Sequence, residues 1–223
     1  MKEISEQYQK RLTLSNAKRA LLEQRLQGKF NMGGTSSHSI PRHPRSDAPT
    51  PLSFAEQRLW FLEELEERYP TYTIPFGFRL KGQLNVAALE QSVNEIVRRH
   101  DTLRTSFTAI KGVPHKQILS TLTLPLPVHD LRQFPAAERD KRLQTLVQQE
   151  ARYLFDLAQC PLLRVALLRL ADQEHLFLLT IHHIVYDGWS IGVFMRELSA
   201  LYNAFATGKS SRSAFLCAPQ IAN

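Results

Sequence analysis

The chain has 223 residues, 43% of them hydrophobic, and a net charge of +7. This hydrophobic content suffices for a folded core, and no apolar run is long enough to cross a bilayer, because Arg164 and Arg169 interrupt the best candidate. Residues 1–50 hold 9 basic and 4 acidic residues, so the rest is nearly neutral and lacks the basic stripe of a nucleic-acid-binding surface. The first residues are charged, which predicts no secretory signal. We therefore expect a cytoplasmic protein without nucleic-acid or membrane partners.

A modest apolar stripe at helical spacing predicts a helical leader over residues 1–27, with Ser15 as a candidate N-cap. The stripe consists of Ala17, Leu21, Leu22 and Leu26. This stripe has two interpretations. We favour a helix that packs on its own domain, and the alternative is a surface that binds a partner. Residues 28–50 are rich in Gly, Ser, Pro and His, which is typical of a flexible linker.

The predicted folded part spans residues 51–209. Ser53 and Glu56 have the spacing of a capping box and predict the start of a helix. Apolar residues alternate over 74–80, which predicts a strand, and Pro75 places that strand at a sheet edge or marks its start. A period near 3.6 over 89–97 predicts a second helix.

The remaining elements follow from the same kinds of pattern. In chain order we expect a hairpin turn at Lys111-Gly112, a short strand over 124–128, a long helix over 143–154, apolar strands over 162–170 and 174–182, and a helix over 194–205. Helices and strands alternate without strict βαβ regularity. This order predicts an α/β fold, a two-layer sandwich with a mixed β-sheet and flanking helices.

The segment 182–190, with the sequence HHIVYDGWS, stands between the last strand and the last helix. Alternation along the strand would place His182 and His183 on opposite faces of the sheet. Only one imidazole can then face a given cavity, and the other must be packed. An imidazole titrates near neutrality and is therefore a candidate base.

Three interpretations of this segment stay open from the residues alone. The histidines could be structural, as strand-end histidines often are. They could bind a metal together with Asp187, although histidines on opposite faces cannot both reach one ion. The third interpretation is acyl transfer, with a histidine as the base.

Two further segments complete a pattern of motifs. Residues 52–62 (LSFAEQRLWFL) resemble the first motif of the condensation domains of nonribosomal peptide synthetases, and residues 99–107 (RHDTLRTSF) resemble the second. HHIVYDGWS resembles their HHxxxDG core. The chain is thus similar to a family of chloramphenicol acetyltransferase-like acyltransferases, which implies that fold. The Asp-Gly-Trp-Ser ending resembles the peptide-bond-forming type.

The resemblance implies an activity and assigns the catalytic positions. In the family reaction, the amine of an acceptor aminoacyl thioester attacks a donor acyl or peptidyl thioester. By resemblance, His183 lies at the reaction centre, where it accepts a proton or stabilises the charged intermediate. Gly188 is expected to offer a backbone N–H to the developing oxyanion.

Four further residues are expected to support the site rather than react. His182 is predicted to be a packed core residue. Asp187 is predicted to form a buried structural ion pair with Arg104, with Arg99 as the second choice. Trp189 is predicted to pack against the core.

The resemblance also implies partners and an incomplete domain. Its substrates are carried on the phosphopantetheine of carrier domains, so we expect carrier domains as partners and no directly bound cofactor or metal. The resemblance ends near Lys209, and residues 210–223 are predicted to be an unstructured tail. We therefore expect a single N-terminal lobe, a truncated fragment that is inactive alone unless a separate chain supplies the C-terminal lobe. The alternative is a non-catalytic module that docks carrier proteins.

Overall fold

The computed structural model describes residues 49–65 and 69–211. The predicted helical leader, nearly all of the predicted linker and nearly all of the predicted tail lie outside the described residues. In chain order, the elements are β1 (Thr50–Pro51), α3 (Phe54–Leu65), β2 (Thr73–Lys81), α4 (Val86–Arg99), η1 (Asp101–Arg104), β3 (Thr105–Ile110), β4 (Val113–Ile118), β5 (Val128–Asp130), α5 (Ala136–Ala151), β6 (Leu163–Ala171), β7 (Glu174–His182), η2 (His183–Val185) and α6 (Ser190–Ala206).

The larger sheet has the strand order β2-β7-β6-β5. β5 runs parallel to β6, and the other neighbours are antiparallel, so the predicted mixed sheet is confirmed. β2 is an edge strand, which explains how it accommodates Pro75, a residue without an N–H to donate. At the end of the sheet that carries the HHIVYDGWS segment, Thr73 of β2 pairs with His182 of β7.

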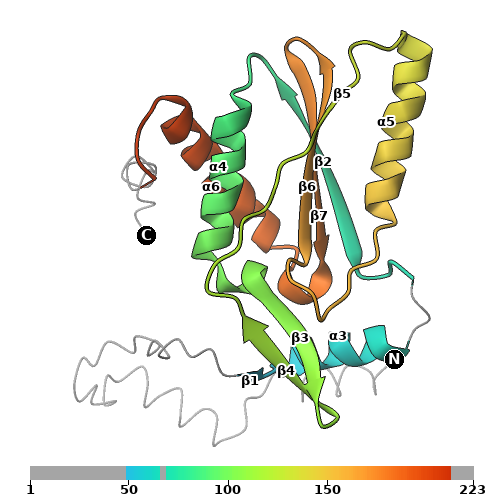
Figure 1. The fold of residues 1–223 in the computed structure, drawn as a ribbon, viewed down its shortest axis with the longest axis vertical. Coiled ribbons are helices and arrows are strands. Elements are labelled where there is room, and N and C mark those ends of the chain that lie inside the picture. Colours follow the sequence, from blue (N-terminus) through green and yellow to red (C-terminus); the bar gives the residue numbers. More distant parts are fainter. Residues whose placement is uncertain (1–48, 66–68, 212–223) are drawn as a thin grey trace, which may run out of the picture. The chain divides into compact units, whose positions relative to one another are not determined.

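Helices cover both faces of this sheet, α4 and α6 on one and α5 on the other (Figure 1). The main core joins apolar side chains of α4 and α6 to those of β6 and β7, including Ile96, Leu201, Leu167 and Phe177. A smaller cluster packs α5 against the opposite face through Leu143, Leu146 and Val147, which meet Ala166, Leu168 and Leu178. β6 and β7 are therefore apolar on both faces, which is why they appear in the sequence as nearly continuous apolar runs.

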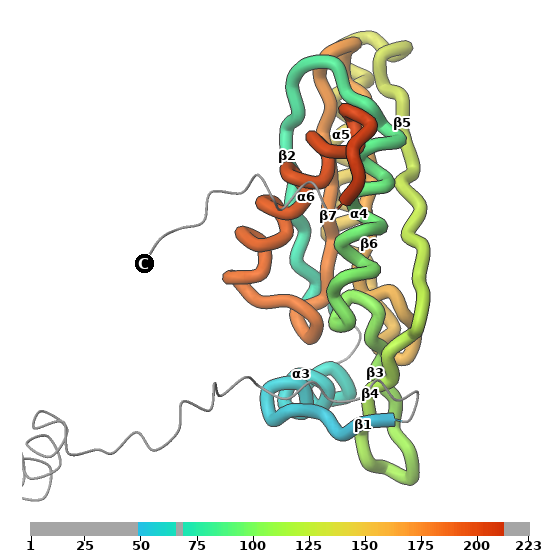
Figure 2. Tube along the Cα trace, turned by 90° about the vertical axis from the view of Figure 1, so that its left-hand side faces the viewer, coloured from blue at the N-terminus to red at the C-terminus, as the bar shows by residue number. Residues whose placement is uncertain are grey.

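A second sheet of three strands has the order β1-β4-β3. Together with α3 it lies at one end of the larger sheet (Figure 2). A core cluster of Leu52, Phe107, Leu157, Leu162 and Ile184 joins this region to the start of β6 and to the turn η2. Leu59 and Trp60 of α3 pack on the same cluster. The helix of the first motif is thus attached directly to the turn of the third.

Two local predictions are confirmed in atomic detail. The Ser53 N–H donates to Glu56 Oε2 at 2.6 Å, and the Glu56 N–H donates to Ser53 Oγ at 3.3 Å, as a capping box requires. The β3–β4 hairpin turns at Lys111 and Gly112, whose φ angles are 52° and 79°. Such left-handed angles at both positions match the right-handed twist of the flanking strands.

The strand predicted over 124–128 is wrong in its position. Leu124 and Leu126 are buried but irregular, and the strand β5 begins at Val128. The physical reason is that side chains of α4 take the backbone groups of this segment. The Leu124 N–H donates to Asn94 Oδ1 at 2.7 Å, and the Leu126 N–H donates to Glu90 Oε1 at 3.2 Å.

No helix among the described residues is long and apolar enough to span a membrane.

Candidate active site

The HHIVYDGWS segment forms a tight connection at the end of β7. The strand ends at His182, one turn of 3₁₀ helix spans His183–Val185, and α6 begins at Ser190. The backbone N–H groups of both histidines are hydrogen-bonded to neighbouring segments of the chain. The His182 N–H donates to the Leu162 carbonyl at 3.0 Å, and the His183 N–H donates to the Tyr72 carbonyl at 2.8 Å. The two imidazoles therefore start from a rigid backbone.

His182 is a core residue, with 1% of its surface exposed. Its ring lies between the rings of Tyr72 and Phe155, with centroid separations of 6.2 and 6.1 Å. The Nδ1 atom accepts the Ile184 N–H at 3.1 Å, so Nδ1 carries a lone pair and the ring proton is on Nε2. Burial, and to a lesser extent the neighbouring His183, lowers the pKa of His182 to about 4. His182 is therefore neutral at physiological pH, which favours its predicted supporting role.

His183 is exposed, in contrast to its neighbour. Its Nδ1 lies 2.8 Å from the main-chain carbonyl oxygen of Tyr186. A carbonyl oxygen only accepts hydrogen bonds, so Nδ1 must carry the proton, and Nε2 of the neutral ring is left with the basic lone pair. The Tyr186 N–H donates to the His183 carbonyl at 3.3 Å and closes the same turn.

Tyr186 is a residue of this turn that the sequence reasoning did not single out. Its side chain is buried, and its ring meets the edge of Phe76 with centroids 5.6 Å apart. This packing holds the carbonyl that selects the tautomer of His183. The contribution comes from the main chain, so no side-chain pattern in the sequence signals it.

The predicted ion pair between Asp187 and Arg104 is wrong. Asp187 is exposed, and its Oδ1 accepts the Ser190 N–H at 2.9 Å as well as the Ser190 hydroxyl. These bonds from Ser190 lower the pKa of the Asp187 carboxyl. The physical reason for the error is that the N–H groups at the start of α6 lack helical partners, and Asp187 is the acceptor nearest to them in sequence.

Arg104 is 3% exposed and serves a different part of the fold. Its guanidinium donates to the carbonyls of Val97 at 3.0 Å and Arg98 at 3.3 Å, which end α4 without helical partners. It also donates to the carbonyls of Leu119 and Ser120 and to the carboxylate of Asp101. The second choice, Arg99, pairs with Glu95 at 2.7 Å. Both arginines therefore stabilise the end of α4 rather than the turn of Asp187.

The prediction for Trp189 is also wrong, because 82% of its surface is exposed. It precedes the first residue of α6, and the buried stripe of that helix begins only at Phe194. Gly188 is exposed beside it, and a Cβ there would meet nothing within 4 Å. The role of the Gly188 N–H stays a prediction.

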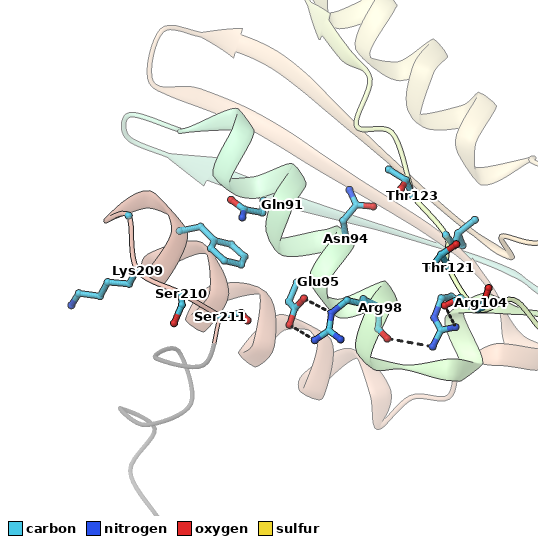
Figure 3. A pocket seen from close by; sticks show the side chains of 14 residues that line it. Gln91, Asn94, Glu95, Arg98, Arg104, Thr121, Thr123, Lys209, Ser210 and Ser211 are labelled. Atoms are coloured by element: carbon cyan, nitrogen blue, oxygen red, sulfur yellow. Dashed lines mark hydrogen bonds and ion pairs between the residues drawn. The ribbon is translucent and has the colours of Figure 1, made fainter. Parts of the chain in front are cut away.

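Two of the hollows in the described part of the chain border α4, and His183 lines neither. A cleft of about 820 Å³ follows the outer side of α4 between Gln91 and Arg104 and reaches Lys209–Ser211 (Figure 3). A cavity of about 130 Å³ lies behind the turn, against Tyr186 and the end of α4 at His100. Within the described ranges, no group of three or more His, Cys, Asp or Glu residues could hold a metal ion. His183 is thus presented on the surface of this lobe rather than enclosed by it.

The described residues form an α/β fold with a mixed sheet and an exposed histidine on the turn after β7, and comparison with known proteins gives the family. The family model of the condensation domain matches residues 47–215. The chain therefore belongs to the condensation domain family.

Curated relatives are synthetases of many times this length. The chain is 44% identical to malpibaldin synthetase of Mortierella alpina over 188 residues, which are 83% of the chain and 3% of that protein. It is 43% identical to phosphinothricin tripeptide synthetase PhsC of Streptomyces viridochromogenes over 195 residues, which are 87% of the chain and 18% of that protein. The chain thus spans a small part of the relatives that it matches.

Solved structures confirm the predicted fold. The X-domain complex with OxyB from teicoplanin biosynthesis gives a TM-score of 0.66 at 29% identity, covering 76% of this chain and 35% of that chain. The starter condensation domain of rhizomide synthetase gives a TM-score of 0.67 at 24% identity, covering 73% and 39%. The α/β fold with a mixed sheet and flanking helices is the chloramphenicol acetyltransferase-like fold of condensation domains.

Proposed function

We propose that this chain is the N-terminal lobe of a peptide-bond-forming condensation domain. In the proposed reaction, the amine of an acceptor aminoacyl thioester attacks the carbonyl carbon of a donor acyl or peptidyl thioester. A C–N bond forms, the C–S bond breaks, and the donor carrier keeps a free thiol. The observation that carries the proposal is the exposed His183, whose Nδ1 is bound to the Tyr186 carbonyl and whose Nε2 is therefore the basic nitrogen.

His183 has two possible tasks in this reaction. Nε2 accepts a proton from the attacking ammonium, and the proton then passes to the leaving thiolate. Alternatively, the protonated ring stabilises the charged tetrahedral intermediate. In both tasks Nδ1 keeps its proton on the Tyr186 carbonyl, and Nε2 is the nitrogen that takes up the second proton. Gly188 lies in the exposed turn with open space around its Cα, which leaves room for the oxyanion to approach its N–H.

The substrates reach this site on partners. We propose carrier domains as those partners, each presenting its substrate on phosphopantetheine, so that the chain needs no cofactor of its own. Tethering both reactants supplies orientation, which is worth about 7–11 kcal/mol in well-aligned systems. That a separate chain supplies the second lobe, and that the protein is cytoplasmic, stay predictions.

The alternative, a non-catalytic module that docks carrier proteins, is not favoured. A docking surface has no need for a histidine held in one tautomer on a rigid turn, whereas a general base needs both features. Amide formation from two loaded carrier domains tests the proposal in a two-lobed domain that contains this chain. We expect His183→Ala to remove most of the product formation, and an unchanged rate would contradict the catalytic assignment.

A further inference from the structure

One buried polar atom next to the site has no hydrogen-bond partner among the described residues. It is Nε2 of His182, which must carry the ring proton because Nδ1 accepts the Ile184 N–H. A buried N–H without an acceptor is costly and requires an explanation. The Oε2 atom of Glu63 lies 3.6 Å from this nitrogen, beyond hydrogen-bond length but within ion-pair range.

Glu63 is held in place by the packing of its helix. α3 begins with the Ser53–Glu56 capping box, and Lys116 of β4 binds the Glu56 carboxylate at 3.0 Å. Further along the helix, Trp60 packs on the cluster that contains Ile184 of η2. Glu63 follows one turn after Trp60 and keeps 22% of its side chain exposed. Its carboxylate is therefore near His182 because of the fold and not through a mobile surface side chain.

We propose that Glu63 is a positioning residue for His183 and acts through His182. Glu63 Oε2 faces the Nε2–H of His182, and Nδ1 of the same ring caps the turn η2 by accepting the Ile184 N–H. That turn carries His183, whose own ring is bound to the Tyr186 carbonyl. The inference rests on the proposed function, because it concerns the residue that we assign as the base.

The rigidity of the imidazole makes this relay effective. Both ring nitrogens of His182 belong to one planar group, so a rotation that moves Nε2 away from Glu63 also moves Nδ1 away from Ile184. The carboxylate also favours a proton on Nε2, and this leaves the lone pair on Nδ1 that the Ile184 N–H requires. Glu63 thus supports the orientation and the tautomer of His182 together.

The experiment compares variants of the whole chain at the two adjacent glutamates of α3. Glu63→Leu removes the acceptor, and Glu63→Gln keeps an acceptor oxygen of the same reach. Glu64→Leu is the matched control, because Glu64 is exposed and lines, together with Glu63, a cleft of about 450 Å³. Ring nitrogen shifts of ¹⁵N-labelled histidine report the tautomers of His182 and His183. Hydrogen exchange of the Ile184 amide reports the cap of the turn.

In Glu63→Leu we expect the Ile184 amide to exchange about tenfold faster and the single tautomer of His183 to become a mixture. Glu63→Gln should restore both signals, and Glu64→Leu should match the unmodified chain. Should Glu63→Leu not fold, Glu63→Asn replaces it, since its amide is one methylene too short to reach His182. We then expect Glu63→Asn to show both changes.

Unchanged exchange at Ile184 and an unchanged His183 tautomer in Glu63→Leu, or in Glu63→Asn where that variant replaces it, would overturn the proposal. So would a change of equal size in Glu64→Leu. The exchange rate and the nitrogen shifts are measured without turnover. A negative result in them is therefore distinct from evidence against the proposed function. The latter would appear as undiminished amide formation in His183→Ala, whatever the nitrogen shifts show.

Discussion

The Nδ1 atom of His183 lies 2.8 Å from the carbonyl oxygen of Tyr186, three residues further along the chain. This single contact removes one ring nitrogen from the chemistry and leaves the other as a base. It is made within one turn of backbone, so the lobe holds the tautomer without help from any other domain. The consequences of this arrangement can be measured.

His183→Ala should lower the rate of amide formation by about 10²–10⁴-fold, the range that a general base contributes. The fold should survive, because the His183 side chain is exposed. The rate is measured with loaded carriers in a two-lobed domain, and thermal melting checks the fold. His129→Ala is the control, since His129 is exposed and lies on β5. A near-normal rate in His183→Ala would remove the catalytic assignment.

The stability of the lobe should depend on pH through His182. Its pKa is lowered from 6.5 to about 4 in the folded state, so the unfolded chain binds the extra proton first as the pH falls. Stability from this group is therefore complete above about pH 6.5 and is lost progressively toward pH 4, by about 3 kcal/mol in total. The groups facing the ring are Glu63, His183 and Tyr72.

Urea unfolding of the chain and of His182→Gln across this window measures that contribution. Carboxylates titrate in the same range, but they do so in both proteins, so the difference between the two curves isolates His182. We expect the unfolding free energy of His182→Gln to fall less steeply as the solution is acidified. Parallel curves would show that His182 does not titrate with a lowered pKa.

Arg104→Met should destabilise the lobe by about 3–5 kcal/mol, because it leaves four carbonyls and a carboxylate without their buried donor. Asp187→Ala should destabilise the lobe much less, because Asp187 is exposed and its partner Ser190 is only three residues away. Arg98→Met is the matched control, since 70% of the Arg98 side chain is exposed. The ion pair predicted from the sequence would be supported by a different result. Arg104→Met and Asp187→Ala would then lose equal amounts of unfolding free energy, and the double variant would lose no more than either single variant.

Trp189→Ala should change the unfolding free energy by less than about 0.5 kcal/mol, as expected for an exposed side chain. The chain has 2 tryptophans, so a Trp60→Phe background isolates the emission of Trp189. In that background we expect emission typical of a solvated indole and strong quenching by acrylamide. A blue-shifted and protected emission would mean that Trp189 is buried after all.

The 223-residue chain by itself should form no amide in a single-turnover assay with loaded donor and acceptor carriers. The His183 side chain is exposed to water on this lobe, so the described residues do not enclose the reaction centre that we propose. The orientation contribution is then lost, and charge that develops in the transition state meets solvent. Product formed at the rate of a two-lobed domain would contradict this expectation.

Local pattern was enough to predict most of the elements. The spacing of Ser53 and Glu56 marked the start of a helix, and Lys111-Gly112 marked a hairpin, because each depends on hydrogen bonds or backbone angles within a few residues. The strand predicted over 124–128 was displaced because the acceptors for its N–H groups are on α4, remote in sequence. The type of an element can therefore be predicted from the sequence where its hydrogen-bond partners lie within a few residues.

The same distinction applies to the site. The sequence by itself determined the family and the turn between β7 and α6, and alternation along the strand predicted different surroundings for His182 and His183. The two histidines do differ in exposure, but the strand ends at His182 and His183 belongs to the turn η2. Only the tertiary structure decided that Arg104 serves the end of α4 and that Glu63 faces His182. These contacts depend on which buried donor meets which acceptor once distant elements are packed, and a one-dimensional pattern does not contain that pairing.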